Sequence, residues 1–294
     1  MIDVHVHVDI YGQDLPRVLR FMDDDRIDQC VLLSVLPSRY HEGVGGTMNW
    51  QVYIAYLNHP DRFIPFFVVD PRAKDLQRQM EIFVELGFRG LGEHKMTDVA
   101  FDAPGCKLIY KMCSKLKLPV LFHIGREGFP ETEMAGVEAV IAGFPDVTFI
   151  AHSMGWWKQI SKVWSVGEHA PIGKVVPGGN VDRMLTKYPN LYADISTGEG
   201  IRALARDPDY TEGFVKKHQK KIIYGSDFPA ETSYETRRYL NQVMFRKKLM
   251  FSHEFPCDLP ENYARVVDLI NADPELRKDL THNNIARILG LQTI

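Results

Sequence analysis

The sequence is poor in cysteine and has neither a long hydrophobic run nor a large net charge. Its four cysteines (Cys30, Cys106, Cys113 and Cys257) show no CxxC spacing, so free thiols in a reduced, cytoplasmic protein are the simplest interpretation. No apolar run approaches the roughly 20 residues that a membrane-spanning helix needs. The formal net charge of −3 gives no reason to expect a nucleic-acid or membrane-surface partner.

The rest of the composition is ordinary for a soluble globular protein. Hydrophobic residues make up 45% and charged residues 25% of the 294 positions, which is enough for a substantial core. This length suits one large α/β barrel or two ordinary domains. The sequence begins with a candidate strand rather than a signal-peptide pattern.

Short apolar segments alternate with segments of helical periodicity along the chain. Eight of them indicate strands, at residues 1–9, 30–36, 63–69, 87–95, 119–123, 147–152, 191–194 and 221–225. Helices are expected at 14–27, 48–58, 75–86, 106–116, 134–142 and 180–187, with two more at 263–271 and 274–289. Eight strands separated by helices predict an α/β fold, the (β/α)8 TIM barrel. A doubly wound sheet would need only about five or six strands. We therefore expect one barrel domain over residues 1–294, with the C-terminal helices packed on it.

The first strand has a polar face of an unusual kind. Val4, Val6 and Val8 alternate with Asp3, His5, His7 and Asp9, so a strand would place the valines on one face and the imidazoles on the other. Two histidines at i and i+2 can converge on a metal ion. An amphipathic edge strand with incidental histidines is the alternative.

Further ligand-type residues follow the other predicted strands. In a barrel the active site lies where the strands end, so the residues at these ends are the candidates for one shared site. They are His5, His7, Glu93, His94, Lys95, His123, His152 and Asp227. Nitrogen and carboxylate ligands together suit zinc best, with manganese and iron as alternatives.

This arrangement resembles the amidohydrolase superfamily, in particular the branch that includes aminocarboxymuconate semialdehyde decarboxylase. The matching pieces are DVHVH at 3–7, PVLFHIG at 119–125, IAHSMG at 150–155, YGSDFP at 224–229 and NIARILGL at 284–291. They span nearly the whole chain. The HxH and GSDxP motifs in this order are specific, whereas HxH alone would not be.

The resemblance implies roles for individual residues. His5, His7, His123 and Asp227 match metal ligands. His152 matches a histidine that transfers protons beside the metal-bound water in mononuclear members and ligates a second metal in binuclear ones. A bound divalent metal lowers the pKa of its water toward about 7, and Asp227 could accept the proton from that water. His152 is suited to exchange the next proton.

The fourth predicted strand leaves the number of ions open. Leu91, Glu93 and Lys95 share parity, so Glu93 and Lys95 should both face the barrel mouth, whereas His94 should not. Binuclear amidohydrolases commonly hold a bridging carboxylate at this strand. We expect one ion with Glu93 close by; two ions bridged by Glu93, or a Glu93 that only forms a salt bridge, are the alternatives.

Substrate contacts are predicted from the loops. Arg39, His41 and Arg126 follow predicted strands and could pair with a substrate carboxylate, although solvated surface side chains would look the same. Trp156 and Trp157 follow His152 directly and could form a wall or lid over the pocket. Packing against the barrel rim is equally compatible with their positions.

These features predict a metal-dependent hydrolase that acts on a small amide, lactone or cyclic ester through a metal-bound hydroxide. The alternative is a metal-dependent, non-oxidative decarboxylase of a small unsaturated or aryl carboxylic acid, which would use the same ligands. A non-catalytic metal-binding barrel is the third interpretation, but structural zinc sites are usually closed and cysteine-rich. The expected partner is a small-molecule substrate, and the resemblance also suggests a homodimer.

Overall fold

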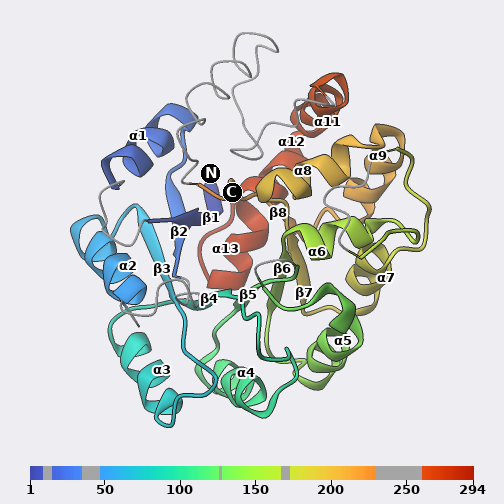
Figure 1. Ribbon diagram of the computed structural model, residues 1–294. Helices are drawn as coiled ribbons and strands as arrows, with labels where there is room; N and C mark the ends of the chain where they lie inside the picture. Colours follow the sequence, from blue (N-terminus) through green and yellow to red (C-terminus); the bar gives the residue numbers. More distant parts are fainter. Residues whose placement is uncertain (9–14, 35–46, 126–127, 167–172, 229–259) are drawn as a thin grey trace.

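The computed structural model describes residues 1–8, 15–34, 47–125, 128–166, 173–228 and 260–294, and it forms a (β/α)8 barrel (Figure 1). The eight strands are parallel and follow the order of the chain, from β1 to β8. The segment after β8 closes the barrel against β1, where the Val4 amide donates to the Tyr224 carbonyl at 3.1 Å and Val6 pairs with Phe228. The predicted fold class is confirmed.

The elements lie close to their predicted positions. The strands are β1 (Ile2–His7), β2 (Gln29–Leu33), β3 (Phe63–Phe67), β4 (Gly90–His94), β5 (Val120–His123), β6 (Phe149–His152), β7 (Leu191–Asp194) and β8 (Ile222–Ile223). The helices around them are α1 (Leu15–Asp25), α2 (Thr47–Asn58), α3 (Leu76–Glu85), α4 (Pro104–Leu116), α5 (Met134–Gly143), α7 (Asn180–Lys187), α8 (Thr197–Ala205) and α9 (Pro208–Lys217). The tail contains α11 (Pro260–Ala272), α12 (Pro274–Lys278) and α13 (Asn284–Leu289).

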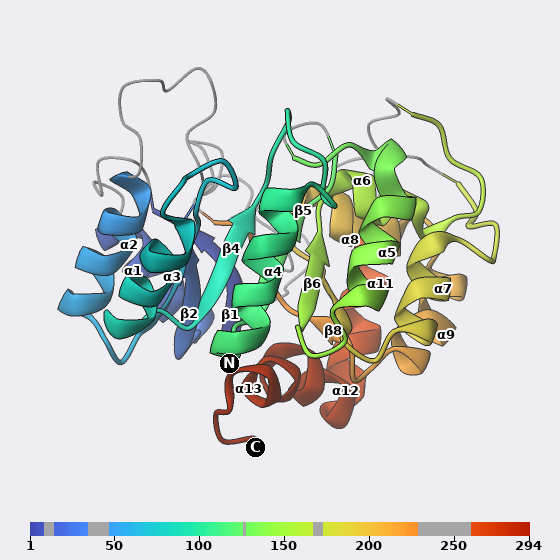
Figure 2. The same ribbon diagram turned by 90° about the horizontal axis from the view of Figure 1, so that it is seen from below.

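The tail helices α12 and α13 close the end of the barrel at which the strands begin (Figure 2). Ile285 and Leu289 of α13 pack with a small apolar cluster from the barrel interior, which includes Ile2, Val4 and Leu121. The helix predicted at 274–289 is interrupted by a single wider π-helical turn at Asp279–Asn283. Because this end is filled with apolar side chains, a polar site must lie at the opposite end.

Two strands break the predicted alternation of side chains. Val4 packs inside the barrel, whereas Val6 and Val8 lie in the layer between strands and helices. The expectation that the three valines share a face was therefore wrong. The pairing of β1 with β2 shifts register between Asp3 and Val6, which lets Val4 face the interior below the imidazoles.

The same irregularity occurs in β4. Leu91 lies in the outer layer and not on the face of Glu93, because the pairing with β5 shifts register between Leu91 and His94. His94 is fully buried behind the strand, and its Nε2 lies 3.2 Å from the Tyr110 hydroxyl. The prediction that His94 points away from the barrel mouth is confirmed.

The segment after β6, where no strand or helix was predicted before residue 180, begins with the short helices α6 (Met154–Trp157) and η3 (Lys158–Ile160). Trp156 and Trp157 are fully buried in the apolar layer outside the barrel. The indole of Trp157 donates to the Asp194 carbonyl at 2.7 Å. Their positions favour packing over a lid.

The predictions of free thiols and of no membrane-spanning helix can be compared with the structure for the described residues only. Cys30, Cys106 and Cys113 are buried and carry free thiols, while Cys257 lies outside the described residues. Among the described helices, none has the length and apolar character needed to cross a membrane.

Candidate metal centre

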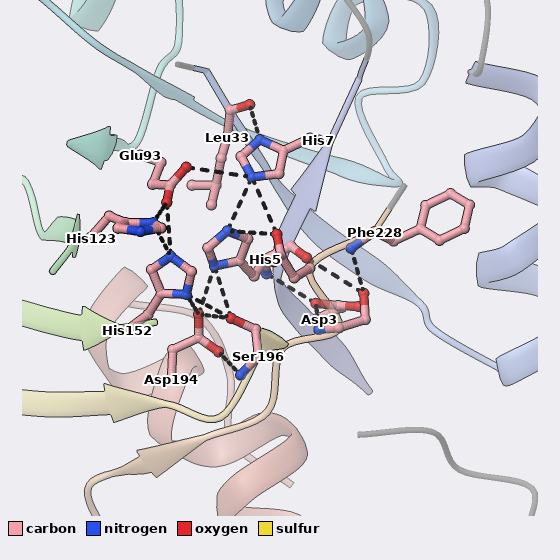
Figure 3. A network of polar contacts seen from close by, with 12 residues as sticks. Asp3, His5, His7, Leu33, Glu93, His123, His152, Asp194, Ser196 and Phe228 are labelled. Atoms are coloured by element: carbon pink, nitrogen blue, oxygen red, sulfur yellow. Dashed lines mark hydrogen bonds and ion pairs between the residues drawn. The ribbon is translucent and has the colours of Figure 1, made fainter. Parts of the chain in front are cut away.

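Polar side chains from six strands or their C-terminal ends meet at one mouth of the barrel (Figure 3). They are His5 and His7 of β1, Glu93 of β4, His123 of β5, His152 of β6, Asp194 of β7 and Asp227 after β8. Most are buried, and Glu93 and His152 expose only 2% and 1% of their surface. Concentrating four imidazoles and three carboxylates in so little solvent requires that they bind one another or a cation.

The two histidines of β1 point their outer nitrogens at each other. The Nε2 atoms of His5 and His7 are 3.1 Å apart. His5 Nδ1 lies 2.7 Å from Asp194 Oδ2, and His7 Nδ1 lies 3.2 Å from the Leu33 carbonyl oxygen. Both Nδ1 atoms face acceptors and must donate, so in the neutral rings both Nε2 atoms carry lone pairs. A cation between them satisfies this arrangement, which is how histidine ligands are held in metal sites.

The negative charges around His5 also favour a cation at this position. Burial lowers the pKa of His5, but the negative charges of Asp227 and Asp194 outweigh it and raise the pKa to about 9. The pocket therefore stabilises positive charge at this ring, whether as a proton or as a metal ion. The residues present fit a divalent metal.

Asp227 lies on the open side of these histidines. Its Oδ1 is 3.3 Å from His5 Nε2 and 3.5 Å from His7 Nε2, and its side chain is 21% exposed. The residue has a left-handed backbone with φ of 59°, and its amide donates to the His5 carbonyl at 2.8 Å. Aspartate tolerates this conformation better than most residues. The turn aims the carboxylate at both imidazoles and leaves one edge toward the mouth.

Glu93 stands between two groups of imidazoles. Its Oε1 is 2.5 Å from His123 Nδ1 and 2.8 Å from His152 Nε2. Its Oε2 is 3.7 Å from His7 Nε2 and 3.2 Å from Lys95 Nζ. Burial would raise the pKa of Glu93, but Lys95 and His123 hold it well below its usual range. Glu93 is thus an ionised carboxylate with each oxygen turned to different partners.

His152 is a neutral acceptor at pH 7. Burial, reinforced by the charge of His5, lowers the pKa of His152 to about 4 despite the hydrogen bond with Glu93. Its Nδ1 lies 3.1 Å from the Ser196 hydroxyl, and its Nε2 lies 3.1 Å from His123 Nδ1. A neutral imidazole of this kind suits metal ligation better than storage of a proton.

Ligand atoms within 4.8 Å of one another form three overlapping groups among the described residues. The first group is His5, His7 and Glu93, and the second is Glu93, His123 and His152. The third group joins His5 and His152 through Asp194. Glu93 belongs to the first two, and the distances place Asp227 beside the first.

Most of the residues predicted for this site do come together. His5, His7, Glu93, His123, His152 and Asp227 meet as described above, and Lys95 contacts Glu93 as its parity predicted. Asp3 lies below them, where its carboxylate accepts hydrogen bonds from the amides of His5 and Ser226, so it joins β1 to the end of β8. Arg39, His41 and Arg126 lie outside the described residues, and their contacts with substrate stay predictions.

Two residues of the site escaped the sequence analysis. Asp194 and Ser196 are fully buried at the end of β7 and contact both His5 and His152. The available signal was the position of Asp194, which is the last residue of its predicted strand like the other ligand-type residues.

Gly225 of the GSD motif is confined by the same residues. A Cβ atom at this position would lie 2.4 Å from Asp194 Oδ1 and 3.0 Å from His5 Cβ.

We expect Gly225→Ala to displace Asp194, to destabilise the fold by about 1–3 kcal/mol and to weaken metal binding. Thermal unfolding and metal titration measure the two effects. Gly213→Ala is the matched control, because a Cβ there meets no atom within 4 Å. Equal metal affinity in Gly225→Ala and the wild type would contradict the close packing.

Solved structures of other proteins share this fold. A probable 2-pyrone-4,6-dicarboxylic acid hydrolase from Acinetobacter baumannii, with citric acid bound, is 13% identical over 99% of both chains, with a TM-score of 0.64. An amidohydrolase from Burkholderia multivorans with bound zinc is 12% identical over 99% of both chains, with a TM-score of 0.61. A 2,6-dihydroxybenzoate decarboxylase from Rhizobium is 15% identical over 98% of both chains, with a TM-score of 0.57.

At these identities the structures establish a common fold and nothing more. No protein with a curated description matches the sequence. The family model of the amidohydrolases, however, matches residues 2–291, which is almost the entire chain. The protein therefore belongs to the amidohydrolase family.

Proposed function

We propose that the protein is a metal-dependent hydrolase of a small carbonyl compound, such as an amide, a lactone or a cyclic ester. The proposal includes two neighbouring subsites for divalent cations, bridged by Glu93. It rests on the position of that carboxylate, whose two oxygens face different sets of imidazoles.

The first subsite would use His5, His7, Asp227 and Glu93 Oε2. The second would use His123, His152 and Glu93 Oε1. Imidazole and carboxylate donors without cysteine suit catalytic zinc, and the Burkholderia multivorans neighbour holds zinc. The neutral state of His152 supports its use as a ligand, since a protonated ring offers no lone pair. The distances therefore favour two ions over the single ion expected from the sequence.

Divalent cations held by these residues would polarise the substrate carbonyl and make a water molecule acidic enough to react near neutral pH. Asp227 is placed to accept the proton of that water, because its side chain borders the first subsite and remains partly exposed. It can then return the proton to the leaving group. Lys95, 23% exposed beside Glu93, adds positive charge at the mouth and favours a substrate with a carboxylate.

Decarboxylation is the second candidate. With one ion at His5, His7, His123 and Asp227, the short contacts of Glu93 Oε1 would be hydrogen bonds donated by ring N–H groups of His123 and His152. Such a site would suit a single Lewis acid that stabilises the electron-rich product of carbon dioxide loss. The bridging position of Glu93 favours hydrolysis, because paired ions are characteristic of hydrolytic enzymes.

A panel of small molecules separates the two reactions. The zinc-loaded protein is incubated with lactones, cyclic esters and amides, and in parallel with aryl and enoic carboxylic acids. We expect products that have gained one water, detected by mass spectrometry, from members of the first set. Release of carbon dioxide without hydrolysis of any member would contradict the hydrolase proposal and support the decarboxylase.

A further inference from the structure

Asp194 and Ser196 form a hydrogen-bonded pair that supports two of the proposed metal ligands from below (Figure 3). Asp194 Oδ2 lies 2.7 Å from His5 Nδ1 and 2.7 Å from Ser196 Oγ. Asp194 Oδ1 accepts a hydrogen bond of 2.7 Å from the Ser196 amide. Ser196 Oγ in turn lies 3.1 Å from His152 Nδ1. One buried carboxylate thus reaches one histidine of each proposed subsite.

The positions of the protons follow from counting donors and acceptors. An ionised carboxylate only accepts, so His5 Nδ1 and the Ser196 hydroxyl must both donate to Asp194. The hydroxyl has one proton, and its use toward Asp194 leaves Ser196 Oγ as an acceptor toward His152. When a cation replaces the proton that His152 Nε2 would otherwise donate to Glu93 Oε1, 2.8 Å away, the ring keeps its proton on Nδ1. With metal bound, both rings are thereby held in the tautomer whose Nε2 lone pair faces the cation.

We propose that Asp194 is a positioning residue that prepares His5 and His152 for metal binding, acting on His5 directly and on His152 through Ser196. This inference rests on the proposed function, because it assigns both rings as ligands. It adds a residue of β7 to a site whose other members come from β1, β4, β5, β6 and the end of β8. Outer partners of this kind typically change metal affinity about 10- to 100-fold when they are replaced.

Asp194→Asn tests the tautomer directly. A carboxamide has one oxygen and one NH2 group, so one of the two faces that now accept must donate. If the oxygen keeps the Ser196 amide, the NH2 group faces His5 Nδ1, and the proton of His5 must move to Nε2. The opposite orientation places two donors against each other at Ser196. We expect Asp194→Asn to bind Zn²⁺ about 10- to 100-fold more weakly than the wild type.

The second readout does not depend on activity. Nitrogen-15 NMR of the histidine rings in the zinc-loaded protein, recorded at saturating zinc, reports which ring nitrogen is protonated. We expect the wild type to show His5 and His152 with Nδ1 protonated, and Asp194→Asn to shift the His5 signals. Asp182→Asn is the matched control, since Asp182 contacts His218 Nε2 at the same distance of 2.7 Å, away from the site. It should lose stability without a change in zinc affinity.

Ser196 variants separate the direct effect of Asp194 on His5 from its effect on His152 through Ser196. Ser196→Ala removes the acceptor for His152 but leaves the contact between Asp194 and His5, so zinc affinity should fall for one subsite only. Ser196→Thr keeps the hydroxyl and should restore the wild-type binding isotherm. Wild-type zinc affinity and unchanged histidine signals in Asp194→Asn would overturn the inference while leaving the proposed function intact. Failure of the wild type itself to bind zinc would instead overturn the proposed function.

Discussion

Asp227→Asn is expected to lower kcat by about 10²- to 10⁴-fold, the range for loss of a general acid or base, while KM changes little. Asparagine keeps an oxygen near His5 and His7 but accepts a proton far less readily than a carboxylate. It also tolerates the left-handed backbone of Asp227, so the turn after β8 should persist. The loss should therefore appear in the chemical step. Steady-state kinetics at saturating zinc, with metal content determined on the same samples, measure it.

Two controls make this result specific. Asp209→Asn removes an exposed carboxylate that pairs with Lys174 and Arg265 away from the site, and kcat should stay unchanged. Added metal should not rescue Asp227→Asn, because the missing group is the proton acceptor. A variant with full metal content that retains more than about a tenth of the wild-type kcat would remove Asp227 from proton transfer.

Glu93→Gln is expected to reduce the metal content from two ions per chain to one and to lower kcat/KM by at least about 100-fold. The neutral amide cannot bridge two cations, and its NH2 group would face either Lys95 or an imidazole. The subsite of His123 and His152 should empty first, because Glu93 is its proposed carboxylate ligand, whereas the subsite of His5 and His7 keeps Asp227. Elemental analysis and calorimetric titration with zinc measure the change.

The matched control is Glu138→Gln. Glu138 also accepts from several donors, namely Arg183, Lys187 and Tyr188, but it lies on the outer helix α5 and pairs with α7 and the residue that follows it. Its replacement should lower stability and leave the metal content at the wild-type value. If Glu93→Gln also retained two ions, the carboxylate could not be the bridge.

The fold was predictable because its signal is repeated. Each βα unit carries the same alternation of a short apolar strand and an amphipathic helix, so an error in one unit does not change the architecture. The face of individual side chains was less predictable. Val4 and Leu91 were assigned by strict alternation, and both lie on the other face because their strands shift register against a neighbour. Such shifts depend on pairing between strands and leave no local pattern.

The residues of the metal site that belong to a recognisable sequence motif could be predicted. The HxH pair, His123, His152 and Asp227 all belong to such motifs, and they meet at the barrel mouth. Asp194 was missed because an aspartate at the end of a strand is not distinctive. Asp70 also follows a predicted strand, yet it pairs with Arg72 near the surface. Only the fold shows that Asp194 reaches His5 and that Asp70 does not.

The metal content of the purified wild type is the decisive test of the proposed pair of metal subsites. Elemental analysis would be combined with anomalous diffraction at the zinc edge, on crystals grown with the metal. We expect two ions per chain, one beside His5, His7 and Asp227 and the other beside His123 and His152, with Glu93 between them. A single ion would return the site to the mononuclear arrangement and favour the decarboxylase. A wild type without stoichiometric metal would contradict the assignment of this barrel mouth as a metal centre.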